Sequence, residues 1–238
     1  MSLGCASPAR AFRRAKLLAH AEHSASGEDR WAADPERRRW ALCDGASEGW
    51  DSGAWAGALS STLVRGGPCL ESIARARRDF AISGAGPQDW LTQRASARGS
   101  WSTALLVEIG RGGRSLHASA IGDSCLFVLD GFDIMASFPL ETALAFSNTP
   151  DLVADRVLPG DGEPTSFRNA VFKLGDLRRP SILLATDALA AFLLQTADKQ
   201  GVLRFLASAT IADFETWTRR KTAEGSLRRD DLTLLWIR

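Results

Sequence analysis

Short apolar runs that border an acidic residue recur along this 238-residue chain. The runs over 40–42, 117–121 and 182–185 lead to Asp44, Asp123 and Asp187, and the pair Asp230-Asp231 directly precedes the run over 232–237. Apolar runs of roughly 4–8 residues between turn signals are typical of buried strands. A carboxylate at the edge of a buried strand is costly unless it is hydrogen-bonded, paired or metal-bound. Several carboxylates that converge would form an all-oxygen site suited to Mg²⁺ or Mn²⁺.

The order of strand and helix signals predicts one α+β domain over residues 1–238 rather than an alternating parallel fold. The Asp130-Gly131 turn predicts a hairpin inside a central meander of antiparallel strands. Residues 1–19 are expected to be irregular, and the weakly patterned residues 139–172 are expected to form a flap. Strands are predicted over 37–43, 101–109, 116–121, 125–129, 133–137, 182–185 and 232–237, and helices over 52–65, 70–82, 187–196, 201–206 and 211–221.

Composition excludes several classes of protein. The net charge of +1 gives no reason to expect a nucleic acid or an acidic membrane surface as partner, and arginine clusters such as 37–39 and 228–229 are interpreted as solvated faces. The four cysteines have no CxxC spacing, which indicates reduced thiols in a cytoplasmic protein. Cys43 and Cys125 are expected in the core, with a nucleophilic role as the minor alternative. No signal peptide or membrane span is expected.

Each acidic segment alone has a simple structural explanation, which on its own is the better one. The explanations are a strand-end turn for Asp44-Gly45, a helix cap for Asp187, a tight turn for Asp123, surface charge for Glu28-Asp29 and a charged turn for Asp230-Asp231.

Together, and in their order, the segments resemble the metal-dependent, type 2C family of serine/threonine protein phosphatases. That family carries an acidic pair near the N-terminus, a strand ending in Asp-Gly, a Ser-Thr-Ala strand, a Gly-Asp-Ser hairpin, a Thr-Asp-Gly segment and a closing Asp-Asn-Ile-Thr strand. The resemblance runs from about residue 20 to the C-terminus, and residues 44–48 and 122–127 look like a divergent bacterial branch. The matching residues are Glu28-Asp29, Asp44-Gly45, Ser102-Thr103-Ala104, Gly122-Asp123-Ser124, Thr186-Asp187-Ala188 and Asp230-Asp231-Leu232-Thr233.

The resemblance implies a sandwich of two antiparallel β-sheets, flanked by α-helices on both faces, with a metal site at one end. Asp44 would bridge two divalent ions, Mn²⁺ or Mg²⁺, with the Gly45 carbonyl beside it. Asp187 and Asp230 would complete one ion. The other would be served by Asp29, with Glu28 nearby, and Asp123 matches the position of a third, weaker ion.

The activity implied is hydrolysis of phosphoserine or phosphothreonine, on proteins, by a water that bridges the two ions. Asp44, Asp187 and Asp230 would act catalytically through that water. A phosphorylated protein is the implied substrate, and a cognate serine/threonine kinase is an implied partner.

Three departures from the family pattern bear on activity. Where the family has Asp-Gly-Met-Gly-Gly, residues 44–48 read Asp-Gly-Ala-Ser-Glu, so Glu48 is an extra carboxylate. Ala188 stands where the family's Thr-Asp-Gly segment has its glycine. Residues 20–26 contain no arginine, which the family commonly uses to hold phosphate. His20 or His23 would substitute as phosphate binder or general acid, unless this stretch is an exposed polar loop. The alternative function is a catalytically weak or inactive regulator that binds a phosphorylated partner or kinase, and a metal-free structural module is a third.

Overall fold

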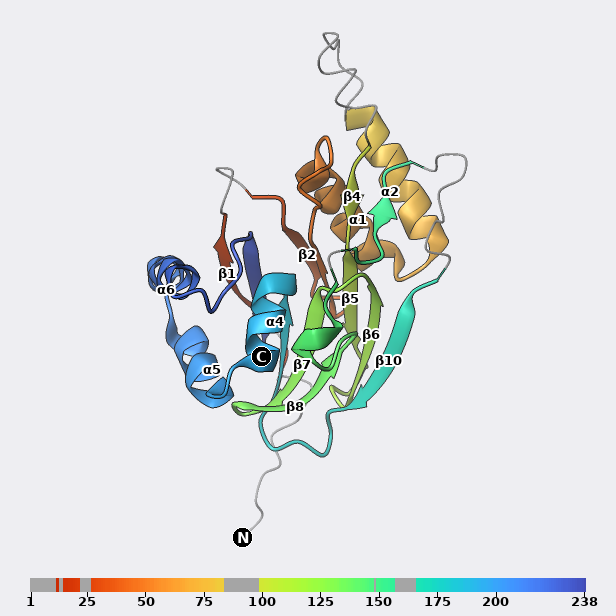
Figure 1. Ribbon diagram of the computed structural model, residues 1–238. Helices are drawn as coiled ribbons and strands as arrows, with labels where there is room; N and C mark the ends of the chain where they lie inside the picture. Colours follow the sequence, from red (N-terminus) through yellow and green to blue (C-terminus); the bar gives the residue numbers. More distant parts are fainter. Residues whose placement is uncertain (1–11, 13–14, 22–26, 84–98, 148, 157–165) are drawn as a thin grey trace.

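Two five-stranded antiparallel sheets form the centre of the computed structural model, which describes residues 12, 15–21, 27–83, 99–147, 149–156 and 166–238 (Figure 1). The first sheet has the order β1 (Ala15–His20), β12 (Leu232–Ile237), β11 (Pro180–Ala185), β7 (Cys125–Asp130), β8 (Asp133–Phe138). The second has the order β10 (Arg168–Lys173), β6 (Ser115–Ile121), β5 (Ala104–Ile109), β3 (Arg39–Cys43), β2 (Arg30–Asp34). The two-residue strands β4 (Trp101–Ser102) and β9 (Val153–Ala154) pair with each other.

The alternation of side chains along the central strands builds three apolar layers. In β12, Leu234 and Trp236 face the helices that cover the first sheet, whereas Leu235 and Ile237 pack between the two sheets. Successive residues of a strand point to opposite faces. Because both faces of β12 are covered, all six of its residues are buried, which explains its almost uninterrupted apolar sequence.

Helices cover both outer faces of the sandwich (Figure 1). Helices α1 (Ser52–Gly66) and α2 (Leu70–Ser83) lie against the second sheet. Helices α4 (Asp187–Gln195), α5 (Lys199–Ser208) and α6 (Ile211–Ala223) lie against the first, and a 3₁₀ turn, η2 (Ala143–Ala145), contacts α4. The predicted α+β sandwich with helices on both faces is therefore confirmed.

Four strands were not predicted. Strands β1, β2 and β10 lie at the edges of the five-stranded sheets, and β9 pairs with β4 alone. The expectation that residues 1–19 are irregular is wrong for 15–19, which belong to β1. The expectation of an irregular flap over 139–172 is wrong for 153–154, which form β9, and for 168–172, which belong to β10. Strand β2 was missed as well. Edge strands need only one apolar face, so their sequences are more polar and alternate weakly.

Helix α1 begins at Ser52 as predicted, and Asp51 is its N-cap, because the Asp51 carboxylate accepts a hydrogen bond of 3.2 Å from the Ala54 N–H. Ser52 is instead a buried residue of the first turn.

Candidate metal and phosphoryl site

The end of β3 carries Asp44, and the Ser-Thr pair that precedes β5 holds its backbone. The Asp44 N–H donates to Thr103 Oγ1 at 3.0 Å, and the Thr103 N–H donates to the Asp44 carbonyl at 2.9 Å. The Ser102 hydroxyl also donates to that carbonyl at 2.9 Å. With its backbone fixed in this way, the Asp44 side chain lines a cavity at this end of the sandwich.

Gly45 lies where the backbones of three segments meet. A Cβ atom at this position would be 2.8 Å from the Ser52 carbonyl group and 2.9 Å from the Glu28 carbonyl oxygen. Both neighbours are backbone, so neither can rotate away. The position requires glycine, and the close packing sets the acidic segment 28–29 beside the Asp44 turn.

Asp29 is held there by contacts of its backbone rather than of its carboxylate. The Glu28 N–H donates to Asp231 Oδ2 at 2.5 Å, and Arg30 Nη1 donates to the carbonyls of Gly27 and Asp29 at 3.1 and 2.8 Å. Both carboxylate oxygens of Asp29 are buried and have no hydrogen-bond partner of good geometry. Burial raises the pKa of Asp29 to about 7, against a smaller opposing effect of the Thr233 hydroxyl.

Asp187 and Asp230 come together because β11 and β12 are neighbours. The Thr186 N–H donates to the Thr233 carbonyl at 3.1 Å, and the Thr233 N–H donates to Thr186 Oγ1 at 3.0 Å. These two hydrogen bonds align the start of α4 with the start of β12. Asp187 accepts from the Ala188 N–H at 2.5 Å, but the N-cap of α4 is Thr186, so the explanation of Asp187 as a helix cap is wrong.

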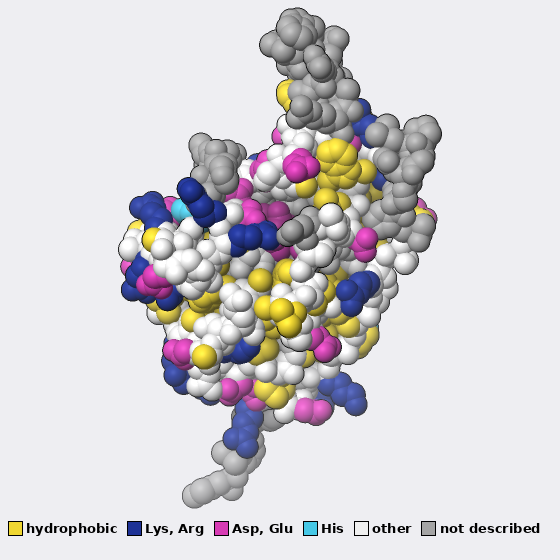
Figure 2. Space-filling view, viewed as in Figure 1, with side chains coloured by type: hydrophobic (Ala, Val, Ile, Leu, Met, Phe, Trp, Pro, Cys, Tyr) yellow, Lys and Arg dark blue, Asp and Glu magenta, His cyan; other side chains and the backbone are white. Residues whose placement is uncertain are grey.

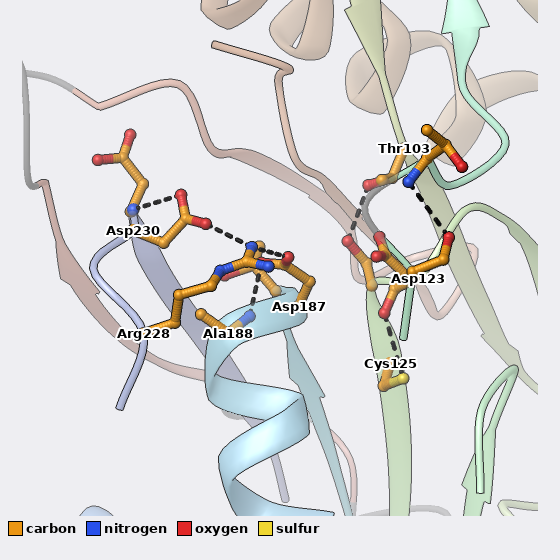
Figure 3. A network of polar contacts seen from close by, with 12 residues as sticks. Thr103, Asp123, Cys125, Asp187, Ala188, Arg228 and Asp230 are labelled. Carbon is orange, nitrogen blue, oxygen red and sulfur yellow. Dashed lines mark hydrogen bonds and ion pairs between the residues drawn. The ribbon is translucent and has the colours of Figure 1, made fainter. Parts of the chain in front are cut away.

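A guanidinium group bridges these two aspartates. Arg228 Nη2 donates to Asp187 Oδ2 and, at 2.6 Å, to Asp230 Oδ2 (Figure 3). Arg228 is exposed, as expected for a solvated face, but its guanidinium also pairs with two carboxylates of the site. The position of Arg228 two residues before Asp230 could have indicated an arginine at the site, but local sequence does not show the direction in which a side chain points.

Asp123 reaches the site from the opposite side, on the β6–β7 turn (Figure 3). Only 6% of the residue is exposed, and burial, assisted by the charge of Asp187, raises its pKa to about 7. The Cys125 S–H donates to the Asp123 carbonyl at 3.3 Å. Gly122 in this turn has a φ of +95°, a left-handed conformation that favours glycine.

These groups surround a cavity of about 540 Å³. Figure 2 shows acidic side chains gathered on this face, with basic side chains next to them. Besides its acidic side chains, the lining includes three residues of segment 139–172, namely Ser147, Pro150 and Leu152. The lining residues are Asp44, Gly45, Ala46, Ser47, Glu48, Trp101, Thr103, Asp123, Ser147, Pro150, Leu152, Asp187, Arg228 and Asp230.

Burial, together with unbalanced negative charge, raises the pKa values of the carboxylates around the cavity. Burial, and then the charge of Asp29, raises the pKa of Asp44 well above its ordinary value. Burial also raises the pKa of Asp187, although the nearby Arg228 opposes this effect. Carboxylates whose pKa values rise together lack the positive charge that would keep them ionised.

The donor set fits hard divalent cations. All the side-chain donors are oxygens, and the buried Asp29 oxygens lack a partner that a cation, directly or through water, would provide. As the side chains stand, no group of three His, Cys, Asp or Glu within the described residues has the spacing of a metal cage. Arg228 takes up the space between Asp187 and Asp230.

The structure thus brings most of the predicted site residues to one place. Asp44, Gly45, Asp123, Asp187 and Asp230 line the cavity, and Asp29 interacts with Asp44 behind it. His20, at the end of β1, does not line the cavity, and His23 lies outside the described residues.

No protein-family model and no curated protein matches the sequence. Solved structures do match. A bacterial serine phosphatase has a TM-score of 0.59 at 15% identity, over 94% of this chain and 97% of that one. The type 2C phosphatase fold is shared. Serine/threonine phosphatase Stp1 from Staphylococcus aureus has a TM-score of 0.58 at 15% identity, over 94% of both chains. PppA, a regulatory component of T6SS in Pseudomonas aeruginosa, has a TM-score of 0.54 at 19% identity, over 94% and 96%.

Two further expectations concern the cysteines and the membrane. Cys43, Cys69 and Cys125 are free thiols in the described part of the chain, and Cys43 and Cys125 are buried as predicted. Burial raises the pKa of Cys125 to about 12 and that of Cys43 further, so neither thiol ionises as a nucleophile must. Over the described ranges, no helix has the length and apolar character needed to cross a membrane.

Proposed function

We propose that this protein is a metal-dependent phosphatase that hydrolyses phosphoserine or phosphothreonine on proteins. The observation that carries the proposal is that four aspartates from four separate segments, Asp44, Asp123, Asp187 and Asp230, line one cavity, with the buried Asp29 next to Asp44. Among the described residues of that lining, Arg228 is the single cationic partner. Buried carboxylates without enough positive charge cost folding free energy, and bound divalent cations would supply that charge. The shared type 2C fold supports this assignment.

The carboxylates would have different roles in binding the ions. Asp44, with the Gly45 carbonyl, would lie between two Mn²⁺ or Mg²⁺ ions. Asp187 and Asp230 would hold one ion, and Asp29 would serve the other. Two such ions lower the pKa of a water and neutralise charge on a phosphoryl group.

Other parts of the chain position these groups. The Ser102 and Thr103 hydrogen bonds fix the Asp44 backbone, and the Thr186–Thr233 pair fixes Asp187 relative to Asp230. Asp123 would hold a third, weaker ion. Trp101, Pro150 and Leu152 also line the cavity, and they would contact the peptide that carries the phosphate.

The test is hydrolysis of an aryl phosphate and of a phosphothreonine peptide in the presence of Mn²⁺. Turnover should vanish in Asp44→Ala and Asp187→Ala and persist in Asp176→Ala, an aspartate outside the cavity. Equal turnover in wild type and in Asp44→Ala would contradict the proposal. Mn²⁺ and phosphopeptide binding without phosphate release would instead indicate the regulator, and a lack of Mn²⁺ binding would indicate a structural module.

A further inference from the structure

Arg228 is the single cationic side chain among the described residues that line the cavity. Five carboxylates line the same cavity: Asp44, Glu48, Asp123, Asp187 and Asp230. A phosphate dianion that entered this space would meet a strongly negative surface. The guanidinium is therefore the one group of the lining that attracts phosphate before any metal is added.

The bridge made by Arg228 uses the atoms that a metal would need. Its Nη2 contacts Asp187 Oδ2 and Asp230 Oδ2, the carboxylates assigned above to one divalent ion. A cation bound to both oxygens and a guanidinium bound to both oxygens exclude each other sterically and electrostatically. Loading of the ion therefore requires Arg228 to leave.

The Arg228 side chain is free to leave without disturbing the fold. It is 54% exposed, whereas those of Asp187 and Asp230 are 11% and 32% exposed, so the guanidinium lies on the solvent side of the carboxylates. The neighbouring backbone is anchored separately. The Leu227 N–H donates to the Lys221 carbonyl at 3.2 Å, Leu227 itself is buried, and the Glu28 N–H donates to Asp231.

We propose that Arg228 is an internal counter-ion that competes with divalent cations for Asp187 and Asp230 and, once displaced, binds the substrate phosphate. This inference rests on the proposed function. The planar guanidinium fork matches the oxygens of a phosphate, and an arginine side chain remains charged whether or not it is paired.

Metal binding tests the competition. Calorimetric titration of Mn²⁺ into wild type, Arg228→Gln and Arg229→Gln compares two neighbouring arginines, of which only Arg228 lines the cavity. We expect Arg228→Gln to bind Mn²⁺ about twofold to fivefold more tightly than wild type, because a half-exposed ion pair competes weakly. Arg229→Gln should resemble wild type. Equal Mn²⁺ affinity in wild type and Arg228→Gln would overturn the competition.

Phosphate binding tests the second half of the proposal. Inorganic phosphate is titrated into the same proteins saturated with Mg²⁺, and Arg228→Lys is added to keep the charge but remove the fork. We expect phosphate to bind about tenfold or more weakly to Arg228→Gln, with Arg228→Lys in between. Unchanged phosphate affinity in Arg228→Gln would overturn the phosphate role alone. Failure of wild type to bind Mn²⁺ would contradict the proposed function as well.

Discussion

The buried carboxylate of Asp29 provides the sharpest test of the site, because substitution should have opposite effects with and without metal. In metal-free protein, Asp29 has a pKa of about 7 against an ordinary 3.8. Full ionisation of this group therefore costs the fold up to about 4 kcal/mol. An amide in its place avoids this cost but remains a buried polar group, which costs about 1–3 kcal/mol without partners. We expect Asp29→Asn to stabilise the metal-free protein by about 1–3 kcal/mol at pH 8.

The pH dependence follows from the sign of the pKa change. A carboxyl group with a raised pKa in the fold retains its full contribution to stability only below the unfolded value of 3.8, and loses it as pH rises through about 7. Wild type should therefore lose stability relative to Asp29→Asn between pH 5 and pH 8. The advantage of the variant should fall to near zero at pH 5.

Urea unfolding at pH 5 and pH 8, in EDTA and in excess Mn²⁺, measures both effects. A ligand at about 1,000 times its Kd stabilises the native state by about 4.1 kcal/mol, so Mn²⁺ at that excess should make wild type the more stable protein. Asp34→Asn is the matched control. Arg37 lowers the pKa of Asp34, so this variant should lose stability at pH 8 rather than gain it. A metal-free Asp29→Asn that is less stable than wild type at pH 8 would refute the reasoning.

Two further predictions concern the support of the Asp44 turn, and both are measured by urea unfolding and by Mn²⁺ titration. Gly45→Ala should lower the free energy of unfolding by about 1–3 kcal/mol and weaken Mn²⁺ binding, because the added Cβ would lie 2.8 Å from backbone atoms. The control Gly57→Ala, whose Cβ would meet only the Arg30 side chain at 3.7 Å, should be neutral or stabilising. Equal effects of the two substitutions would refute the steric argument. Thr103→Val should lower the free energy of unfolding by about 1–3 kcal/mol, because the Asp44 N–H and the Ser124 hydroxyl lose their hydrogen-bond partner at 3.0 and 2.8 Å. An unchanged urea midpoint would contradict this prediction.

The prediction of the central strands and of the helices depended on how completely each is buried. The strand over 232–237 is apolar on both faces and was predicted with its bounds correct. Edge strand β10 alternates weakly, and its exposed Val171 carries no pattern that separates it from a loop. Burial on one face leaves a sequence too much freedom for periodicity to identify the strand.

The sequence by itself determined the apolar strands, the glycine at position 45 and the order of the acidic segments. Only the tertiary structure decided which of these segments touch. The Glu28 N–H and Asp231 are separated by 203 positions, yet they lie 2.5 Å apart, because β12 pairs between β1 and β11 in one sheet. Arg228 shows the same limit. A sequence states its charge, but the neighbours of a long, half-exposed side chain follow from the surrounding fold, which here places the guanidinium between two carboxylates.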